Sequence, residues 1–333
     1  MKRTLHILML VFLVAHLGRA QDQQFTQFYA VPNGLNPAFA GASVQSRLSM
    51  QYRNQWAAIP GGFQAGTCSY DQYISDIKSG IGLMFSYDRA GSGGLSTSAV
   101  SLQYAYEAKI RRNWYFRPAL QFGYGMKSIN FEKLTFYDQM IREGNPTSIE
   151  QGTIQPVNYF DMGAGLLTYG KKFWLGVSAY HNNTPNTSFY DNSVHIQPRR
   201  LSAHGGYRFR IKGRSLKKID HYLVAAMNYE AQKKFDHLDL GLYYEFNPMI
   251  LGLWYRGLPV KSNHYGYMNH DAVALLVGFQ SANYKFGYSY DITISRFGIA
   301  NSGGSHELSL TYQWANRRNS RSKRIRIVPC AKF

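Results

Sequence analysis

The feature that most constrains this chain is an alternation of apolar and polar side chains with a period of two residues. In residues 237–246, HLDLGLYYEF, leucine and aromatic side chains occupy every second position, and mostly polar residues fall between them. Residues 307–314, ELSLTYQW, repeat the pattern. Shorter versions occur at residues 81–87, 100–106, 116–124 and 284–290. Such stripes predict β-strands with one apolar and one polar face.

The full pattern predicts about fourteen strands joined by connections of unequal length. The strands are expected at residues 46–56, 62–73, 79–89, 95–110, 113–128, 157–169, 172–182, 198–212, 219–231, 235–246, 249–257, 270–280, 282–294 and 305–316. Every second connection is short: 74–78, 111–112, 170–171, 213–218, 247–248 and 281. The alternate set holds the long connections, 129–156, 183–197, 258–269 and 295–304, with short ones near 57–61, 90–94 and 232–234. Short turns at one end and long loops at the other are typical of bacterial outer-membrane barrels.

The chain beyond residue 20 has no apolar stretch of the length that a membrane-spanning helix needs, about 20 residues. In lipid, only helices and closed barrels satisfy every backbone polar group. The sequence therefore predicts an all-β fold, a closed antiparallel transmembrane β-barrel with a short plug-like segment before it. The alternative is a secreted sandwich or propeller. A sandwich does not require all its long loops at one end, and no repeat of fixed period indicates a propeller.

The first twenty residues have the pattern of a secretory signal peptide. Lys2 and Arg3 precede an apolar run, and Gly18 and Ala20 supply small residues before the expected cleavage site. We expect residues 1–20 to be removed and the protein to reach the outer membrane. The rest divides into an irregular segment, a barrel and a basic tail, at residues 21–45, 46–316 and 317–333. The irregular segment is expected to form a small plug, or a lid at the periplasmic mouth.

The chain is strongly basic, with 37 Lys and Arg against 19 Asp and Glu and a formal charge of +18. Loss of Lys2, Arg3 and Arg19 with the signal peptide would leave about +15. Basicity of this size is also a property of nucleic-acid-binding proteins. Here the charges are spread over turns and alternating strand positions, so we interpret them as solvated turns and a polar lumen. We expect no nucleic-acid partner for an exported protein.

No group of residues forms a recognisable catalytic or cofactor site. The GSGG run at 91–94 lacks the other parts of a phosphate-binding loop and falls in an expected turn. His264 and His270, with Asp271, lie in or beside a long loop, where histidines are more often solvated than bound to metal. We therefore expect no enzymatic activity, no cofactor and no metal.

The two cysteines are Cys68, in an expected strand, and Cys330, near the end of the basic tail. Two cysteines do not make the disulfide framework of a small secreted domain. Because one lies in the barrel wall and the other in a tail, we predict that they form no structural disulfide.

Several blocks of sequence together resemble one known family. They are QDQQFTQFYAVPNGLNPAFAGA at 21–42, YRNQWAAIPGGFQ at 52–64, HELSLTYQW at 306–314 and RIRIVPCAKF at 324–333. The combination resembles the PorP/SprF family, outer-membrane proteins of the type IX secretion and gliding machinery of Bacteroidota. Ala331 stands where the family's ending usually has proline. The motif positions, which are candidates for partner contact, are Leu35, Asn36, Pro37, Gly41, Tyr52, Arg53, Gln55, Trp56, Arg324, Arg326, Pro329, Cys330 and Phe333.

The resemblance implies an outer-membrane barrel that supports the secretion or surface attachment of a particular cargo protein, such as a large adhesin. It also implies contact with periplasmic or peptidoglycan-linked subunits of the machine. The alternative is a passive or gated channel for a small or hydrophobic solute, because a barrel fold does not determine function. A ligand-sized tunnel through the lumen would favour the channel. A lumen filled by side chains and plug would favour the accessory role.

The chemistry of the motif residues also predicts their local conformation and contacts. Pro37 favours extended geometry at Asn36, and Gly34 and Gly41 permit tight bends. Arg53 and Gln55 fall on one face of their strand. If that face is the lumen, Arg53 is expected to pair with a carboxylate of a neighbouring strand or with the plug.

The basic tail carries six cations between Arg317 and Arg326, followed by apolar side chains at Ile327 and Val328. Their mutual repulsion would keep the tail from folding alone. An acidic surface could attract it over long range. We therefore predict that residues 317–333 dock onto a periplasmic subunit.

Overall fold

The structure is a computed structural model that describes residues 22–43, 45–130, 134, 137–141, 155–190, 193–211, 221–262 and 268–315. Its strands are β1 (Ser46–Gln55), β2 (Phe63–Ile74), β3 (Ser79–Ala90), β4 (Leu95–Tyr106), β5 (Ala108–Arg111), β6 (Trp114–Ser128), β7 (Val157–Tyr169), β8 (Phe173–Tyr180), β9 (Arg200–Ile211), β10 (His221–Gln232), β11 (Phe235–Phe246), β12 (Met249–Ser262), β13 (Met268–Gln280), β14 (Tyr284–Thr293) and β15 (Ser305–Trp314). Its helices are short: α2 (Pro32–Leu35), the 3₁₀ helix η1 (Pro37–Phe39), α3 (Tyr137–Ile141) and α4 (Ile299–Ser302).

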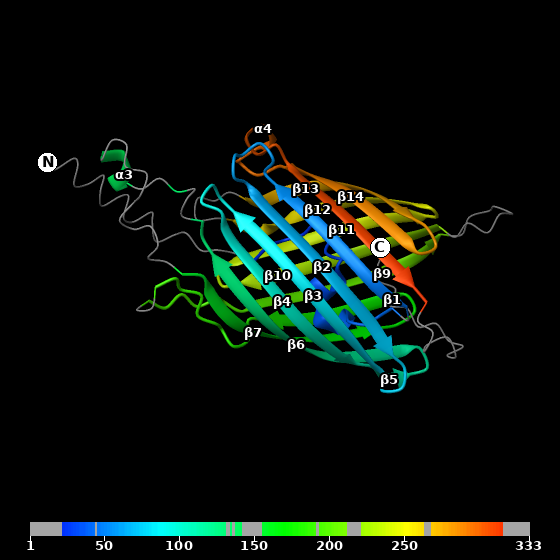
Figure 1. Cartoon of the computed structure of the whole chain (residues 1–333). Coiled ribbons are helices and arrows are strands. Elements are labelled where there is room, and N and C mark those ends of the chain that lie inside the picture. Colours follow the sequence, from blue (N-terminus) through cyan, green and yellow to red (C-terminus); the bar gives the residue numbers. More distant parts are fainter. Residues whose placement is uncertain are drawn as a thin grey trace.

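The strands form one antiparallel 15-stranded sheet that closes into a barrel (Figure 1). β1 pairs with β15 at the seam between the first and last strands, and β4 pairs with β6. β5 also pairs with β6, so over the described residues the strands fill fourteen positions in the wall. The predicted barrel of about fourteen antiparallel strands is therefore confirmed. Most strand ends lie within two residues of the prediction.

Two predicted strands differ from the observed ones. The strand expected at 95–110 is divided into β4 and β5 by the single residue Glu107, whose N–H still donates to the carbonyl oxygen of Lys78 in line with the β3–β4 pairing. β12 continues past the predicted end at residue 257, through register shifts on both sides of Leu258. Such bulges let a strand with Pro259 at this position bend and continue.

The connections confirm the predicted asymmetry with two changes. Because β12 is longer, its connection to β13 spans 263–267, which is shorter than predicted, whereas the one from β9 to β10 spans 212–220, which is longer. Connections 129–156, 181–199 and 294–304 share one end of the barrel, which we call the long-loop mouth. The opposite end is the short-turn mouth, where β1 begins and β15 ends. Figure 1 shows α3 and α4 together at the long-loop mouth.

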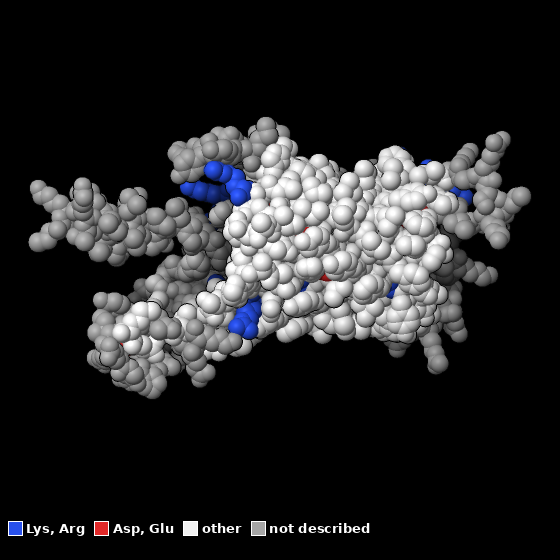
Figure 2. Space-filling view, turned by 90° about the horizontal axis from the view of Figure 1, so that it is seen from above, with Lys and Arg blue, Asp and Glu red and all other residues white. Residues whose placement is uncertain are grey.

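The outward face of the wall is apolar. Among its exposed side chains are Met50, Leu83, Phe85, Leu102, Leu120, Leu166, Leu242, Leu253, Leu275 and Leu310. Figure 2 shows few charged atoms along the wall, with most visible Lys and Arg toward the ends of the barrel. An apolar band between polar ends is the surface that a bilayer requires. No helix within the described ranges is both long and apolar enough to cross a membrane.

The irregular segment before β1 lies inside the barrel. We call its described residues, 22–43, the plug; they contain α2 and η1. At one end Asp22 accepts a hydrogen bond from Gln197 in a connection of the long-loop mouth. At the other, the N–H of Gly41 donates to Asp71 near the short-turn end of β2. The plug therefore crosses the lumen antiparallel to β1. The expected plug is present, but it reaches the opposite mouth instead of forming a lid at the mouth where β1 begins.

Candidate functional site

The plug and the lumen wall around it form the candidate functional site. Gln27, Asn33, Asn36, Ala38 and Ala40 are each 0% exposed, because strands surround the plug on all sides. Most of its side chains and many of its backbone groups have partners on strands far away in the sequence. These contacts fall into several groups along the barrel axis.

The first group lies at the seam between β1 and β15. The two carboxylate oxygens of Glu307 accept hydrogen bonds from the backbone N–H of Thr26 at 2.8 Å and of Gln27 at 2.7 Å. The same carboxylate accepts from Gln51 at 2.6 Å and from Arg53 at 2.9 Å. One buried carboxylate of the last strand thus binds both the first strand and the plug.

The charges continue across the neighbouring strands. Arg53 also pairs with Asp291 at 2.7 Å, and Arg256 pairs with Asp239 at 2.8 Å. The hydroxyl of Thr26 donates to Asp291 and accepts from Arg53 and Arg256. This confirms the expectation that Arg53 faces the lumen and meets both a neighbouring carboxylate and the plug. Buried ion pairs contribute little net stability, but removing one partner is costly, typically about 3–5 kcal/mol.

An aromatic group follows in the middle of the lumen. Phe28 packs edge-to-face on Trp254 with ring centroids 5.0 Å apart, and Tyr29 packs likewise on Tyr243 at 4.9 Å. All four side chains are buried. Edge-to-face pairs of this kind add to the free energy gained by burying the rings.

The Leu35-Asn36-Pro37 motif lies against β7 and β8. The side-chain amide of Asn36 donates to the carbonyl oxygens of Leu166 at 3.1 Å and Val177 at 3.0 Å. Gly165 and Gly176 make room for this contact, because a Cβ at either position would press on the Asn36 amide. The two wall glycines and the motif asparagine therefore form one close-packed unit.

The neighbouring motif residues shape the backbone. Leu35 is buried, and its carbonyl oxygen accepts from the Ser178 hydroxyl at 2.8 Å. Pro37 begins η1, where a residue without an N–H is tolerated. The Asn36 side chain accepts from the N–H of Ala38 and caps this helix.

The short-turn end of the plug is fixed around Gly41. Its φ of +64° is a left-handed conformation, and a Cβ there would lie 2.6 Å from the Cα of Gly80. Asp71 accepts from the Gly41 N–H at 2.8 Å and from Arg47 at 2.7 Å. Only glycine fits this position without moving the wall.

Arg117 binds the plug backbone beside this turn. Its guanidinium is 0% exposed and donates to the carbonyl oxygens of Ala38, at 3.0 Å, and Ala40. Glu107, the residue between β4 and β5, neutralises Arg117 at 3.1 Å and accepts from Tyr169 at 2.6 Å. Because β4 and β5 pair with β6 in the same register, Glu107 stands opposite Arg117 as a cross-strand partner.

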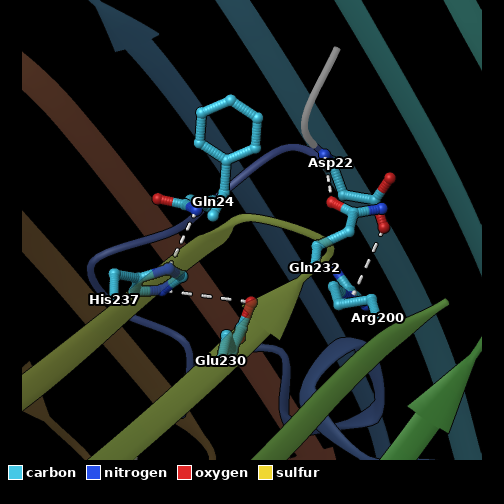
Figure 3. A pocket seen from close by; sticks show the side chains of 7 residues that line it. Asp22, Gln24, Arg200, Glu230, Gln232 and His237 are labelled. Carbon is cyan, nitrogen blue, oxygen red and sulfur yellow. Dashed lines mark hydrogen bonds and ion pairs between the residues drawn. The ribbon is translucent and has the colours of Figure 1, made fainter. Parts of the chain in front are cut away.

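The long-loop end of the plug is held by its first described residue. The carboxylate of Asp22 accepts from His181 at 2.8 Å and Gln197 at 2.7 Å, and lies 3.5 Å from Arg200. The N–H of Asp22 donates to the side chain of Gln232 at 3.2 Å. Figure 3 shows Gln232 and Arg200 on the same side of Asp22, each joined to it by a dashed line.

Charge keeps both Asp22 and His181 ionised. Burial by itself would raise the pKa of Asp22, but the charges of His181 and Arg200 hold that pKa well below its usual range. Burial would lower the pKa of His181, but Asp22 and Asp161 raise it to about 9. Asp161 lies 2.8 Å from the second ring nitrogen of His181.

A small polar pocket lies beside this end of the plug (Figure 3). It is lined by Asp22, Gln24, Arg200, Glu230, Gln232, Phe235 and His237. Its cavity volume of about 10 Å³ is room for one water molecule. Gln24 contacts His237 at 3.1 Å across it. The pocket is too small for an organic ligand.

The remaining motif residues of the first hairpin lie at the wall and rim. Tyr52 faces outward and is 47% exposed. Gln55, half-buried, ends β1 at the long-loop mouth. Trp56 has a φ of +60° and packs between Phe63 and Phe297, with ring centroids 5.2 and 5.5 Å away. The hairpin motif therefore shapes the rim of the barrel and does not reach the plug, except through Arg53.

Several predicted positions lie outside the described residues. These are Arg324, Arg326, Pro329, Cys330 and Phe333, with His264 from the predicted loop. Cys68 is a half-buried free thiol of β2, opposite the outward-facing Met50 and Phe85. Within the described ranges, no group of three or more potential ligands could hold a metal ion, and the ring of His270 contacts the Tyr255 hydroxyl at 2.6 Å.

Sequence reasoning did not identify the partners of the plug. Glu307 and Asp239 were placed on the polar faces of their strands, but alternation cannot say which cation each one meets. Asp22 lies in a segment without periodicity, and His181 falls at the end of the strand expected at 172–182, directly after the observed end of β8. The sequence signal that pointed to these partners was the presence of carboxylates on the polar faces of the strands beside the seam.

Structural comparisons return outer-membrane barrels. The outer membrane protein Omp33 of Acinetobacter baumannii is 8% identical, covers 82% of this chain and 100% of its own, and has a TM-score of 0.44. The toluene transporter TodX of P. putida is 9% identical, with 85% and 93% coverage and a TM-score of 0.45. The KdgM porin is 6% identical, with 80% and 99% coverage and a TM-score of 0.39. Similarities this low carry no conclusion about function, and the barrel fold rests on the strand pairing itself.

No curated protein matches the sequence. The family described as type IX secretion system membrane protein PorP/SprF matches residues 17–312, most of the chain. This match spans the plug with its Leu35-Asn36-Pro37 motif and all of the wall up to β15. The chain therefore belongs to the PorP/SprF family of type IX secretion system membrane proteins and is an outer-membrane β-barrel.

Proposed function

We propose that this protein is a non-enzymatic accessory barrel of the type IX secretion system, which supports the secretion or surface attachment of a cognate cargo protein such as a large adhesin. Family membership supports the link to the secretion system. The observation that carries the accessory role is the filled lumen. Plug residues between Gln27 and Ala40 are buried, apart from the half-buried Gly34, and polar groups of the wall bind them on several sides.

The filled lumen argues against the alternative, a channel for a small or hydrophobic solute. A solute path needs a cavity of ligand size, typically a few hundred Å³. The pocket beside Asp22 holds about 10 Å³, and the lumen axis is occupied by protein. We infer that the barrel presents surfaces to partners at its two mouths and does not conduct.

The partners proposed for the two mouths differ. In the orientation usual for such barrels the long loops face the cell exterior, so cargo would meet the long-loop mouth. In that orientation the short-turn mouth, where β15 ends at Trp314, would face the periplasm, which supports a periplasmic position for the basic tail. The tail, residues 317–333, lies outside the described residues. Its six cations favour an acidic partner among the periplasmic or peptidoglycan-linked subunits.

Deletion of the gene in its native host, followed by surface and secretome proteomics, tests the proposal. We expect one or a few surface proteins to be lost while general outer-membrane composition stays unchanged, with recovery when the gene is restored. An unchanged surface and secreted proteome would contradict the accessory role. A second test measures the conductance of the purified protein in planar bilayers. A steady porin-like conductance would support the channel.

A further inference from the structure

The two ends of the plug are held in different ways. Residues from Thr26 to Ala42 are almost all buried, whereas Asp22 to Phe25 are half-buried at the long-loop mouth. Asp22 makes most of the contacts of this end, with side chains at the mouth, and Gln24 adds one to His237. Thr26 and Gln27, directly below, are anchored separately by the Glu307 carboxylate. Loss of the Asp22 contacts therefore leaves the next anchor intact.

One loop supplies two of the groups that hold Asp22. His181 stands at the start of the connection 181–199 and Gln197 near its end. The loop is closed on itself, because the N–H of Gln197 donates to the carbonyl oxygen of Pro185 at 2.9 Å. A short antiparallel bridge joins Asn186 to Ile196 within it. A loop braced in this way moves as one unit, and its movement pulls both groups away from Asp22 together.

The backbone at the base of this loop is strained. His181 has a φ of +57°, a left-handed conformation that costs free energy in any residue with a Cβ. Asp22 on one side of the ring and Asp161 on the other, each at 2.8 Å, hold the side chain in place. Strain that is maintained by a charged contact is relieved when that contact is lost.

We propose that residues 22–25 are a releasable latch of the plug, which the loop 181–199 holds at the long-loop mouth and which leaves the lumen when that loop moves. The rest of the plug, from Thr26 to Gly41, stays in place. The latch couples the loops at this mouth to the interior of the barrel. It does not depend on which cargo or subunit the protein serves.

Charged and titratable side chains from several strands surround the latch. They are Asp88 on β3, Lys127 on β6, Tyr159 and Asp161 on β7, Tyr180 on β8, Arg200 on β9, Glu230 on β10 and His237 on β11. Acidic and basic groups are mixed, and neutralising Asp22 leaves His181 with Asp161, whereas neutralising His181 leaves Asp22 with the more distant Arg200. The contact is therefore sensitive to either single change.

Spin labelling of the purified full-length protein in lipid vesicles tests the latch. A nitroxide is attached at Gln23→Cys in a background with Cys68→Ser and Cys330→Ser, and its mobility is measured by electron paramagnetic resonance. A second label at Ser43→Cys reports the short-turn end of the plug. We expect an immobile spectrum at both positions in the unaltered latch.

Asp22→Asn and His181→Asn are the two latch variants. Asparagine suits the left-handed backbone at position 181 and removes the charge. Each variant should raise the mobile fraction at residue 23 several-fold and leave residue 43 unchanged. Asp76→Asn, the same change in an exposed turn at the short-turn mouth, is the matched control and should have no effect.

Three outcomes would overturn the proposal: a label at residue 23 that is already mobile in the unaltered protein, one that stays immobile in both variants, or equal loosening at residues 23 and 43. The last would show that the plug moves as one body. Asp22→Asn changes no wall residue, so the test remains available even if His181→Asn fails to assemble.

Discussion

The two halves of the plug are held in the barrel by different kinds of interaction. In the long-loop half, residues 22–27, charged side chains at the mouth and the seam bind the plug. In the short-turn half, residues 28–42, aromatic packing and wall glycines fix it, together with hydrogen bonds of the plug backbone with Arg117 and Asp71, which are fully buried and paired within the wall. Charged contacts can be titrated or displaced, whereas close packing yields only when the wall itself moves. One continuous segment therefore has one end that can be released and one end that stays fixed in the wall.

The largest expected effect comes from removing the Glu307 carboxylate, which binds both β1 and the plug from β15. Glu307→Gln leaves Arg53 with fewer partners and places an amide against the N–H groups of Thr26 and Gln27. Removing one partner of a buried ion pair typically costs about 3–5 kcal/mol, and here Arg53 keeps Asp291, so the lower end of this range applies. We expect folding stability to fall by that amount, or assembly to fail, as measured by urea unfolding of the folded band on unheated gels. An unchanged unfolding midpoint would show that the seam cluster is dispensable.

A smaller loss is expected in the packed half. Gly41→Ala adds a Cβ 2.6 Å from the backbone of Gly80, at a φ of +64°. Overpacking of this kind costs about 1–3 kcal/mol in addition to the backbone strain. Gly91→Ala is the matched control, because Gly91 has a φ of +74° and nothing within 4 Å of the added Cβ. If both variants lose the same stability in urea, packing against the wall contributes nothing at Gly41.

The smallest expected effect is a difference in pH dependence between the two halves of the plug. The pKa of His181 is raised from 6.5 to about 9, so the stability it contributes is fully present below pH 6.5 and is lost as pH rises through about 9. A spin label at residue 23 should therefore become more mobile between pH 8 and 10, while one at residue 43 should not. His181→Asn should abolish the pH dependence. Mobility that rises equally at both positions would mean that the alkaline change is not local to the latch.

Much of the wall could be predicted from the sequence because each strand carries its own signal. Alternation located β7 and β11 at their observed boundaries and assigned Glu307 and Asp239 to the polar face. The prediction was wrong at the end of β12, which continues through bulges past Pro259. It also did not identify the one-residue interruption at Glu107 between β4 and β5, where the pairing register does not change.

The plug could be predicted to exist but not to follow its observed path. Its turn-forming residues indicated an irregular segment, and Arg53 was expected to face it or a carboxylate. The contacts that set its course join residues far apart, such as Gln27 with Ser309. No periodicity relates such positions, so a sequence pattern cannot choose between a lid at one mouth and a segment through the whole lumen.

A cysteine cross-link between plug and wall tests the filled lumen most directly. The side-chain oxygens of Gln27 and Ser309 lie 2.7 Å apart, so Gln27→Cys with Ser309→Cys, in the background without Cys68 and Cys330, places two thiols close to each other inside the barrel. After treatment of native outer membranes with a short bifunctional thiol reagent, we predict a linked peptide pair by mass spectrometry. The control pair, Gln27→Cys with Leu308→Cys, should stay unlinked because Leu308 faces outward. Free thiols in the first pair, or equal linking in both, would contradict a plug inside the barrel.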